Sequence, residues 1–405
     1  FVSAVSGSIT MASALTTQTA GGNIRYAAGT SIALSALNAG TGKVSLVTGT
    51  GSITDQNAAS LNVTASQLRI ESGGAVATGA DALEITVDTL AAQSVNGMFF
   101  SEASALTIGT VSVAVDYLNA NLSTTTVTDA SLSGLVTSSN GAIVLVTANG
   151  TLTVAQVVTA NGTGNVLLQA QTTAGNDKDV LLNAAASSGT GNISVIANNS
   201  VTQAAAGDLT TVGGTVDVEA QNGLITMANG AVASSGGGSI RYLAAQSVVL
   251  GGLNAVAGTV EVTATAGSIT DGGIADLEVI AGTLRLDSST GIGTSANALD
   301  ISVATLAVRT EGSIYLEESD EVTVGSVAGV QVQRVAAAGT TAAWPVFAVA
   351  TAGLTTTANG NIVLYTLNGS LTVDQPVSVT GNGNVRLETR AATVNDKDVF
   401  LNAPV

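Results

Sequence analysis

A short polar motif with two carboxylates occurs twice in the chain, as Asn-Asp-Lys-Asp at 176–179 and again at 395–398. Its carboxylates are Asp177, Asp179, Asp396 and Asp398. Carboxylate oxygens are hard ligands of the kind that Ca²⁺ prefers. The alternative is a plain turn in which the lysine offsets the carboxylates, because the motif lacks the Gly-rich nonapeptide spacing of calcium-binding β-rolls. Ca²⁺ is the one cofactor that the sequence suggests.

The densest run of acidic residues is a second candidate for chemistry, and it comprises Glu317, Glu318, Asp320 and Glu321. Paired carboxylates hydrolyse glycosidic bonds, and β-helical enzymes act on polysaccharides. However, a matching stretch earlier in the chain, at 101–105, keeps only Glu102, opposite Glu318, and the chain has no His that could act as a general base. We therefore interpret the run as a solvated edge and expect no enzyme activity.

Asparagine follows a corner glycine at several places, namely Asn23, Asn165, Asn192, Asn361 and Asn384. Glycine and asparagine tolerate the positive φ angles of tight turns. Asparagines at the same corner of successive structural units stack their amides, so we expect these five to form a structural ladder.

Longer repeats explain why such corners recur. Gly7-Ser8-Ile9-Thr10-Met11-Ala12 returns at 223–228 as Gly-Leu-Ile-Thr-Met-Ala, and the Ile-Arg-Tyr of 24–26 returns at the same offset, at 240–242. The second Asn-Asp-Lys-Asp motif lies three positions beyond this offset, so three residues are inserted in between. The chain is therefore predicted to be one continuous structure made of two long copies, about 7–222 and an incomplete 223–405.

A shorter period divides each copy into segments that begin with glycine and have about 24 residues, a length typical of one solenoid coil. The segment 360–381 illustrates it, with predicted strands at 361–366, 370–373 and 377–380. Each strand alternates apolar and polar residues, which places one face inside and the other in solvent. Three strands per segment predict a roughly triangular coil, and stacked coils shield one another's apolar faces. The fold class is thus all-β, a parallel β-helix of roughly 17 coils, right-handed as parallel crossovers are.

The composition agrees with a narrow core of branched aliphatic side chains. Hydrophobic residues make up 45% of the chain but aromatic residues only 3%, and the net charge is −17. An acidic protein does not favour nucleic acid or an anionic membrane. Residues 335–354 carry no charge, yet their glycines, threonines and proline lie within a repeat, so we expect no membrane insertion.

Two segments, 113–140 and 329–359, break the regular pattern, and the second contains Trp344 and Pro345. They are either protruding loops that contact a partner, as loops on rigid scaffolds do, or longer coils with Trp344 packed locally. The first alternative would make the chain a specific binding module.

The chain resembles the filamentous-haemagglutinin-like and giant β-strand-repeat adhesins of Gram-negative bacteria. The resemblance is carried by Gly-Asn-Ile before alternating strands, by Asn-Gly-Ser-Leu-Thr-Val at 368–373 and by Gly-Ser-Ile-Thr-Asp at 51–55. It implies a secreted, extracellular or cell-surface protein.

We therefore expect a structural repeat segment of a bacterial filament, sheath or adhesin that acts as a stiff spacer and cell-contact fibre. Its expected partners are copies of itself, end to end or laterally, or a host or neighbour cell surface. A carbohydrate-active β-helix enzyme is the alternative from another class, and it predicts carboxylates converging on one face across adjacent coils.

Overall fold

The computed structural model describes residues 1–172, 174–273, 276–344, 350–390 and 397–405. In this described part the chain is all-β without a helix, and its stacked parallel strands form a β-solenoid of about 17 turns, which confirms the predicted fold class. The chain divides into two compact units. Unit 1 comprises Phe1–Ser194 with the short later segment Val335–Thr341, and unit 2 comprises Val195–Arg334 with Ala342–Val405.

The strands up to residue 197 are β1 (Val2–Ala4), β2 (Ile9–Thr10), β3 (Thr16–Gln18), β4 (Ile24–Ala28), β5 (Ile32–Leu34), β6 (Ala36–Asn38), β7 (Lys43–Thr48), β8 (Ile53–Asp55), β9 (Val63–Ser72), β10 (Leu83–Ser94), β11 (Met98–Glu102), β12 (Leu106–Ile108), β13 (Thr110–Leu118), β14 (Thr124–Ser133), β15 (Leu135–Thr137), β16 (Ile143–Thr147), β17 (Leu152–Val154), β18 (Val158–Ala160), β19 (Val166–Ala170), β20 (Val180–Leu182), β21 (Ala186–Ser188) and β22 (Ile193–Ala197). The later strands are β23 (Val201–Gln203), β24 (Leu209–Thr210), β25 (Val216–Ala220), β26 (Ile225–Met227), β27 (Val232–Ser234), β28 (Ile240–Ala244), β29 (Val248–Leu250), β30 (Gly252–Asn254), β31 (Thr259–Ala264), β32 (Ser268–Asp271), β33 (Val279–Ser288), β34 (Gly291–Ile292), β35 (Leu299–Thr310), β36 (Ser313–Glu318), β37 (Val322–Val324), β38 (Ser326–Val327), β39 (Gln333–Val335), β40 (Thr341–Ala343), β41 (Thr351–Ala352), β42 (Leu354–Thr356), β43 (Ile362–Thr366), β44 (Leu371–Val373), β45 (Val377–Val379), β46 (Val385–Thr389) and β47 (Val399–Leu401).

The coil at 360–381 contains three strands, as the sequence predicts: β43, β44 and β45. In β43 the side chains of Ile362 and Leu364 are fully buried, while the side chain between them is only half-buried. Each strand lies parallel to its counterpart one coil away, as in the pairing of Ile362 with Val385. Alternation therefore sets which side chains enter the core, and stacking satisfies the backbone hydrogen bonds.

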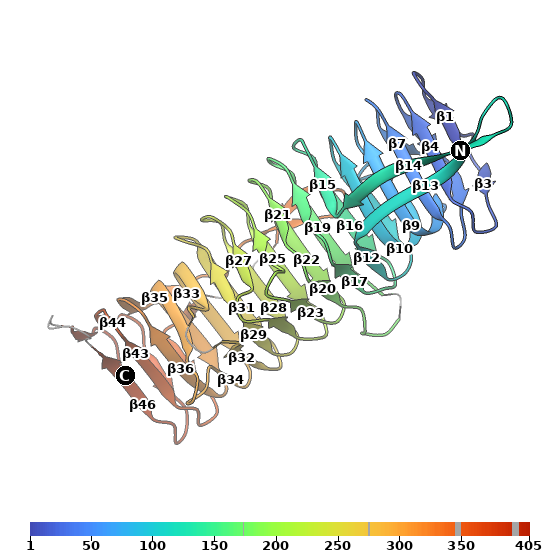
Figure 1. Cartoon of the computed structure of the whole chain (residues 1–405). Coiled ribbons are helices and arrows are strands. Elements are labelled where there is room, and N and C mark those ends of the chain that lie inside the picture. The colour runs from blue at the N-terminus through green and yellow to red at the C-terminus, as the bar shows by residue number, and fades with distance from the viewer. Residues whose placement is uncertain (173, 274–275, 345–349, 391–396) are drawn as a thin grey trace. The chain divides into compact units, whose positions relative to one another are not determined.

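The core is a column of Val, Ile, Leu and Ala with few aromatic side chains. Tyr242 and Phe100 are the largest of its fully buried members in the described part of the chain. The Tyr242 hydroxyl donates to the side-chain oxygen of Gln203 at 3.0 Å, so this buried polar group is satisfied. Figure 1 shows the strands stacked in like direction from coil to coil within each unit.

In each long copy, one long strand pairs with three later strands. In unit 1, β10 pairs in parallel with three later strands, β11, β12 and β15. In unit 2, β35 pairs in the same way with β36, β37 and β42. Both branch-point strands are 12 residues long, so each is long enough to pair with three shorter strands along its length.

An arm leaves the solenoid at each branch point. The first arm is the antiparallel hairpin β13–β14, residues 110–133. The second arm comprises the described residues 326–344 and 350–352, and the antiparallel pair β38–β41 begins and ends it. The glycine that ends each arm, Gly134 or Gly353, has a φ of 75° or 73°. A Cβ at either position would lie within about 2 Å of a backbone oxygen of the next coil, so only glycine fits.

Candidate functional site

The first arm lies across the outer face of the coils in unit 1, over β4, β7, β9 and β10 (Figure 1). Parallel register places Arg25, Ser45 and Arg69 next to one another on this face. Asp129 of the arm accepts from the Arg25 guanidinium at 2.8 Å and from the Ser45 hydroxyl at 2.6 Å. The Ala130 carbonyl of the arm accepts from Arg69 at 2.7 Å. The arm thus supplies the negative charge that this row of side chains lacks.

Burial opposes ionisation of Asp129, but hydrogen bonds from Arg25 and Ser45 hold the pKa of this carboxyl below its usual range. The apolar side of the arm packs as well. Val111, Val113 and Val115 are buried against Ala91 of β10. The first arm is therefore a packed part of unit 1.

The same face in unit 2 carries charges of alternating sign. Successive coils place Asp217, Arg241, Glu261 and Arg285 in direct register. We call this row, together with Arg25, Ser45 and Arg69 of unit 1, the charged track. Alternating charges in adjacent strands attract, and parallel stacking holds them in one geometry.

The second arm adds a cation to the charged track. Arg334 binds Asp217 at 2.7 Å and also binds Glu219. Arg241 binds the same two carboxylates, at 2.7 and 3.1 Å. The Asp217 side chain is fully buried, so this group of four is a closed charge network. Burial opposes ionisation of Glu219, but the two guanidinium groups hold its pKa below its usual range.

Further along unit 2, the second arm makes two more contacts with the charged track. The Val330 amide donates to the Glu261 carboxylate at 2.8 Å, and Arg285 donates to the Thr351 hydroxyl at 2.9 Å. Arg285 also pairs with Glu261 at 2.9 Å. The arm is thus fixed by backbone and side-chain contacts at several coils.

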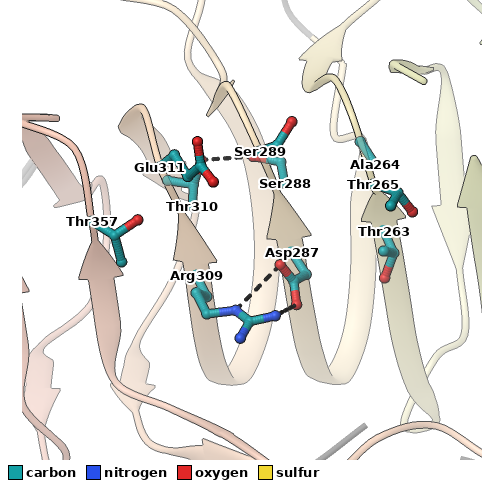
Figure 2. Close-up of a pocket in the computed structure, with 10 residues that line it drawn as sticks. All are labelled: Thr263, Ala264, Thr265, Asp287, Ser288, Ser289, Arg309, Thr310, Glu311 and Thr357. Carbon is teal, nitrogen blue, oxygen red and sulfur yellow. Dashed lines mark hydrogen bonds and ion pairs between the residues drawn. The ribbon is translucent and has the colours of Figure 1, made fainter. Parts of the chain in front are cut away.

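A shallow cavity of about 390 Å³ lies beside the charged track in unit 2. Its walls are mainly hydroxyl side chains with one ion pair, in which Arg309 binds Asp287 at 2.6 Å (Figure 2). The Arg309 side chain is 61% exposed. Such a surface offers hydrogen bonds to a polar ligand, but no apolar pocket that would hold a small molecule.

Trp344 contacts the second arm and is 37% exposed, and its role as a partner contact stays a prediction. The Arg334 guanidinium lies 3.8 Å from the centre of the Trp344 ring, and the Trp344 amide donates to the Val332 carbonyl at 2.8 Å. The indole thereby covers the charge network of Asp217. Pro345, predicted as a partner contact together with Trp344, lies outside the described residues.

The corner asparagines bond from coil to coil in two pairs. The Asn165 side-chain oxygen accepts from the Asn192 amide at 2.9 Å, and the Asn361 oxygen accepts from the Asn384 amide at the same distance. Asn23 makes the same contact with a lysine in the next coil, and its side-chain oxygen accepts from the Lys43 backbone amide at 2.8 Å. These residues satisfy backbone groups at a corner.

Replacing Asn165 with Ala is expected to lower the stability of unit 1 by about 1–3 kcal/mol, because three hydrogen bonds are lost. Asn165 accepts two from Asn192 and donates one to Gly339. Hydrogen exchange of unit 1 measures the effect. Asn384→Ala is the matched control, because the side chain of the exposed Asn384 donates a single hydrogen bond, to Asn361, within the described residues, and its backbone bond to Asn361 is kept in the variant. Equal losses in the two variants would contradict this assignment.

The Asn-Asp-Lys-Asp motif forms the same corner contact in both copies. The Asp179 amide donates to the Thr151 hydroxyl, and the Asp398 amide donates to Ser370. Asp177 is 69% exposed and pairs with its neighbour Lys178 at 3.1 Å. Asp396 lies outside the described residues. In the described residues no three acidic, His or Cys side chains gather as a metal site, and calcium binding stays a prediction.

The solvated-edge interpretation is wrong for Glu318. Its side chain is fully buried and accepts from the Val303 amide at 3.1 Å and from the Asp320 amide at 3.2 Å. Burial raises the pKa of Glu318 to about 8. Glu102, its counterpart in the first copy, is buried in the same way on the Val87 and Ser104 amides. The alternation of β36 turns Glu318 inward, where it satisfies orphaned backbone donors.

Carboxylates of adjacent coils do approach one another in unit 2, which sequence register alone did not reveal. Register pairs Asp300 with Glu317, and Glu278 accepts from the Asp300 amide at 2.9 Å. Burial and the nearby Asp271 and Asp300 raise the pKa of Glu278 to about 9. Burial, Glu317 and Asp271 raise the pKa of Asp300 to about 6. Four carboxyl groups thus form one acidic cluster.

In the first long copy, different residues occupy the positions that form the acidic cluster in the second copy. Asn62 stands where the second copy has Glu278, and it donates to Asp55 at 2.6 Å. Asp81 stands where the second copy has Asn297, which donates to Asp271 at 2.7 Å. Each copy therefore places one amide and one acid beside a central aspartate.

Sequence reasoning missed the charged track, although a signal was present. Arg25 and Arg241 occur in the repeated Ile-Arg-Tyr, and Arg69 and Arg285 occur at the repeated position two coils later. Arginine at a fixed outward position of successive strands indicates a ladder of charges. Its partners on the arms could not be recognised, because they come from segments without the coil period.

Fold and site define a β-solenoid repeat protein. Comparison with family models, with curated proteins and with solved structures found no match to this chain. In the described part of the chain, no helix has the length and apolar character of a membrane span.

Proposed function

We propose that this chain is a structural repeat segment of a long, exported filament, sheath or adhesin stalk, in which it acts as a stiff spacer and cell-contact fibre. The observation that carries the proposal is the parallel register of equivalent strands from coil to coil in each unit. A rod of this kind bends only if ladder hydrogen bonds are strained or the close-packed core is opened.

The surface chemistry supports the same role. The net charge of −17 favours solubility and opposes collapse of neighbouring fibres. Ion pairs of the charged track hold each arm against the coils. These contacts cross-link successive coils in the direction perpendicular to the strands. An extracellular surface is the proposed location, with copies of the chain or a cell surface as partners and without nucleic acid.

Two measurements test the proposal. Antibodies against the chain should label intact cells of its source without permeabilisation, and labelling only after lysis would contradict an exported role. Deletion of one coil, residues 360–382, should leave a folded protein that is shorter by one coil, about 4.8 Å in small-angle scattering. Loss of the folded state on removal of this single coil would contradict a passive spacer.

The second candidate is a carbohydrate-active enzyme, and the acidic cluster of Asp271, Glu278, Asp300 and Glu317 favours it. A carboxyl kept protonated at neutral pH beside an ionised one is the arrangement of glycosidases. A screen on neutral and acidic polysaccharides tests this candidate. Activity that disappears in Glu278→Gln would support it, whereas an inactive parent chain would leave the spacer as the function.

A further inference from the structure

Two carboxylate oxygens at one corner of unit 1 are buried and accept no hydrogen bond from the described residues. They are Oδ2 of Asp55, a residue that is 8% exposed, and Oε2 of Glu84. The hydroxyl of Ser35, a fully buried residue of the same corner, has no partner either. A buried charged acceptor without a donor is costly, because it loses its hydration and gains nothing in return. These oxygens therefore need a donor or a cation.

Hydrogen bonds through Asn62 bring the two carboxylates to the same place. The Asn62 side chain donates to Asp55 Oδ1 at 2.6 Å and to the Ser35 carbonyl at 3.1 Å. Asn62 and Glu84 lie one residue ahead of the first paired position of β9 and β10, and the Glu84 amide donates to the Asn62 side chain at 2.8 Å. Residues in parallel register point to the same side, so the Glu84 carboxylate lies on the side where Asn62 meets Asp55.

A third carboxylate, Asp81, lies exposed beside this pair. The turn that carries it is closed by two backbone hydrogen bonds between Thr78 and Asp81, at 2.9 and 3.1 Å. A Cβ on Gly79, inside the turn, would overlap the carbonyl oxygen of Ala338, so the second arm holds the turn from one side. Burial and the nearby Asp55 carboxylate raise the pKa of Asp81. The carboxylates of Asp55 and Asp81 are therefore close together.

The negative charge at this corner has no basic partner in the described residues. The ion pairs found in unit 1 all use other carboxylates. Burial and the charge of Asp55 raise the pKa of Glu84 to about 7. Carboxylates that repel one another in a buried place are stabilised by a bound cation, which removes the repulsion and satisfies the unpaired oxygens at once.

The second long copy has an amide at this place. Asn297 occupies the position of Asp81, and its side chain donates to Asp271, the counterpart of Asp55, at 2.7 Å. The other carboxylate oxygen of Asp271 accepts from the Gly273 amide. The chain itself thus satisfies both oxygens of this aspartate. In the first copy a carboxylate stands where the amide donor should be, so the described residues leave the Asp55 oxygen for a ligand from solution.

We propose that Asp55 Oδ2 and Glu84 Oε2 bind a hard divalent cation, with Asp81 on its open side and water completing the coordination shell. Mg²⁺ is commonly held by one or two carboxylates and several waters, and Ca²⁺ takes the same oxygen ligands in a looser shell. Three acidic side chains do not converge on one point in the described part of the chain, so the proposed site uses two protein carboxylates. This inference goes beyond the spacer function and does not depend on it.

A cation at this place would join two successive coils. Asp55 ends β8, whereas Glu84 lies in β10, one coil further along the stack. The Asn57 amide donates to Asp55 Oδ1 at 2.8 Å, and the Glu84 amide donates to the Asn62 side chain. Both amides are therefore local reporters, because opening either bond disturbs the side chains that hold the cation.

Native-state hydrogen exchange of the full chain at neutral pH tests the site, with CaCl₂ and MgCl₂ titrated separately. A bound cation is expected to slow exchange of the Asn57 and Glu84 amides by about 100-fold at a concentration 100 times its Kd. The salt that acts at the lower concentration identifies the preferred cation. KCl at matched ionic strength corrects for screening. If neither divalent salt slowed these amides beyond KCl, the proposal would be overturned.

Two variants and one control locate the effect. Glu84→Gln is expected to weaken cation binding about tenfold or more, since even the loss of an outer partner of a metal site costs that much. Asp81→Asn introduces the amide of the second copy, which should satisfy Asp55, keep the chain folded and weaken binding as well. Asp88→Asn removes an exposed carboxylate from the same strand and should leave binding unchanged. Equal cation affinity in all three variants would contradict the assignment.

A proton shared between the carboxylates is the competing occupant, and the same measurement separates it from a metal ion. Exchange rates are compared between pH 5 and pH 8 after correction for the intrinsic pH dependence of exchange. If acidification slowed the Asn57 and Glu84 amides while neither divalent salt did, the ligand would be a proton and the cation proposal would be wrong. Slowing by Ca²⁺ or Mg²⁺ at neutral pH that Asp81→Asn weakens would support the proposal.

Discussion

Replacing Asp217 with Ala is expected to lower the free energy of opening of strands β25 and β28 by about 3–5 kcal/mol, because two buried guanidinium groups lose their shared partner. Arg241 and Arg334 both bind this carboxylate at 2.7 Å, and the Asp217 side chain is fully buried. Native-state hydrogen exchange measures the effect strand by strand. The second arm should become sensitive to protease in the same variant.

Asp177→Ala is the matched control for this experiment. Asp177 also pairs with a basic side chain, at 3.1 Å, but it is 69% exposed, so its loss should cost at most about 1 kcal/mol. The quadruple variant Asp217→Leu, Glu219→Gln, Arg241→Met, Arg334→Met should recover most of the loss, since no unpaired charge of this network is left buried. If Asp217→Ala and Asp177→Ala had the same cost, the charge network would not hold the arm.

Unit 2 is expected to lose stability as the pH rises from about 5 to about 9, because Glu278 must give up its proton in a buried site. The pKa of Glu278 is about 9 in the folded chain against its usual 4.5. Between these values the folded state holds a proton that the unfolded chain has released. The stability is therefore fully present below pH 4.5 and is lost as the pH rises through 9.

The size of this effect follows from the pKa difference. A difference of one pKa unit between the folded and unfolded chain changes the free energy of unfolding by about 1.4 kcal/mol. Glu318, with a pKa of about 8, contributes in the same direction. Glu278→Gln should flatten the profile and raise the melting temperature at pH 9, because an amide keeps the donor without a titrating proton. The first copy already has an amide there, as Asn62.

Melting temperatures between pH 5 and pH 9 check this prediction. Glu311→Gln serves as the control, since Glu311 is an exposed carboxylate of the same unit, and it should keep the slope of the parent chain. A slope that is identical in Glu278→Gln and in the parent would exclude Glu278 as its source.

The sequence by itself determined the coil. Alternation along 361–366 predicted which residues of β43 are buried, and the glycine and asparagine corners predicted where its strands end. These features are local, because a two-residue period and a turn depend only on neighbouring residues. The stacking of coils followed from the repeat, since equivalent strands of a solenoid lie in register.

Only the tertiary structure decided where the irregular segments lie and what they bind. Residues 113–140 and 329–359 lack the coil period, so nothing in them indicated that Asp129 meets Arg25 or that Arg334 meets Asp217. The inward turn of Glu318 depended likewise on the Val303 amide of another coil, together with the Asp320 amide beside it. Contacts between distant segments depend on how the coils stack and on which donors and charges that stacking leaves unpaired, and a local pattern records neither.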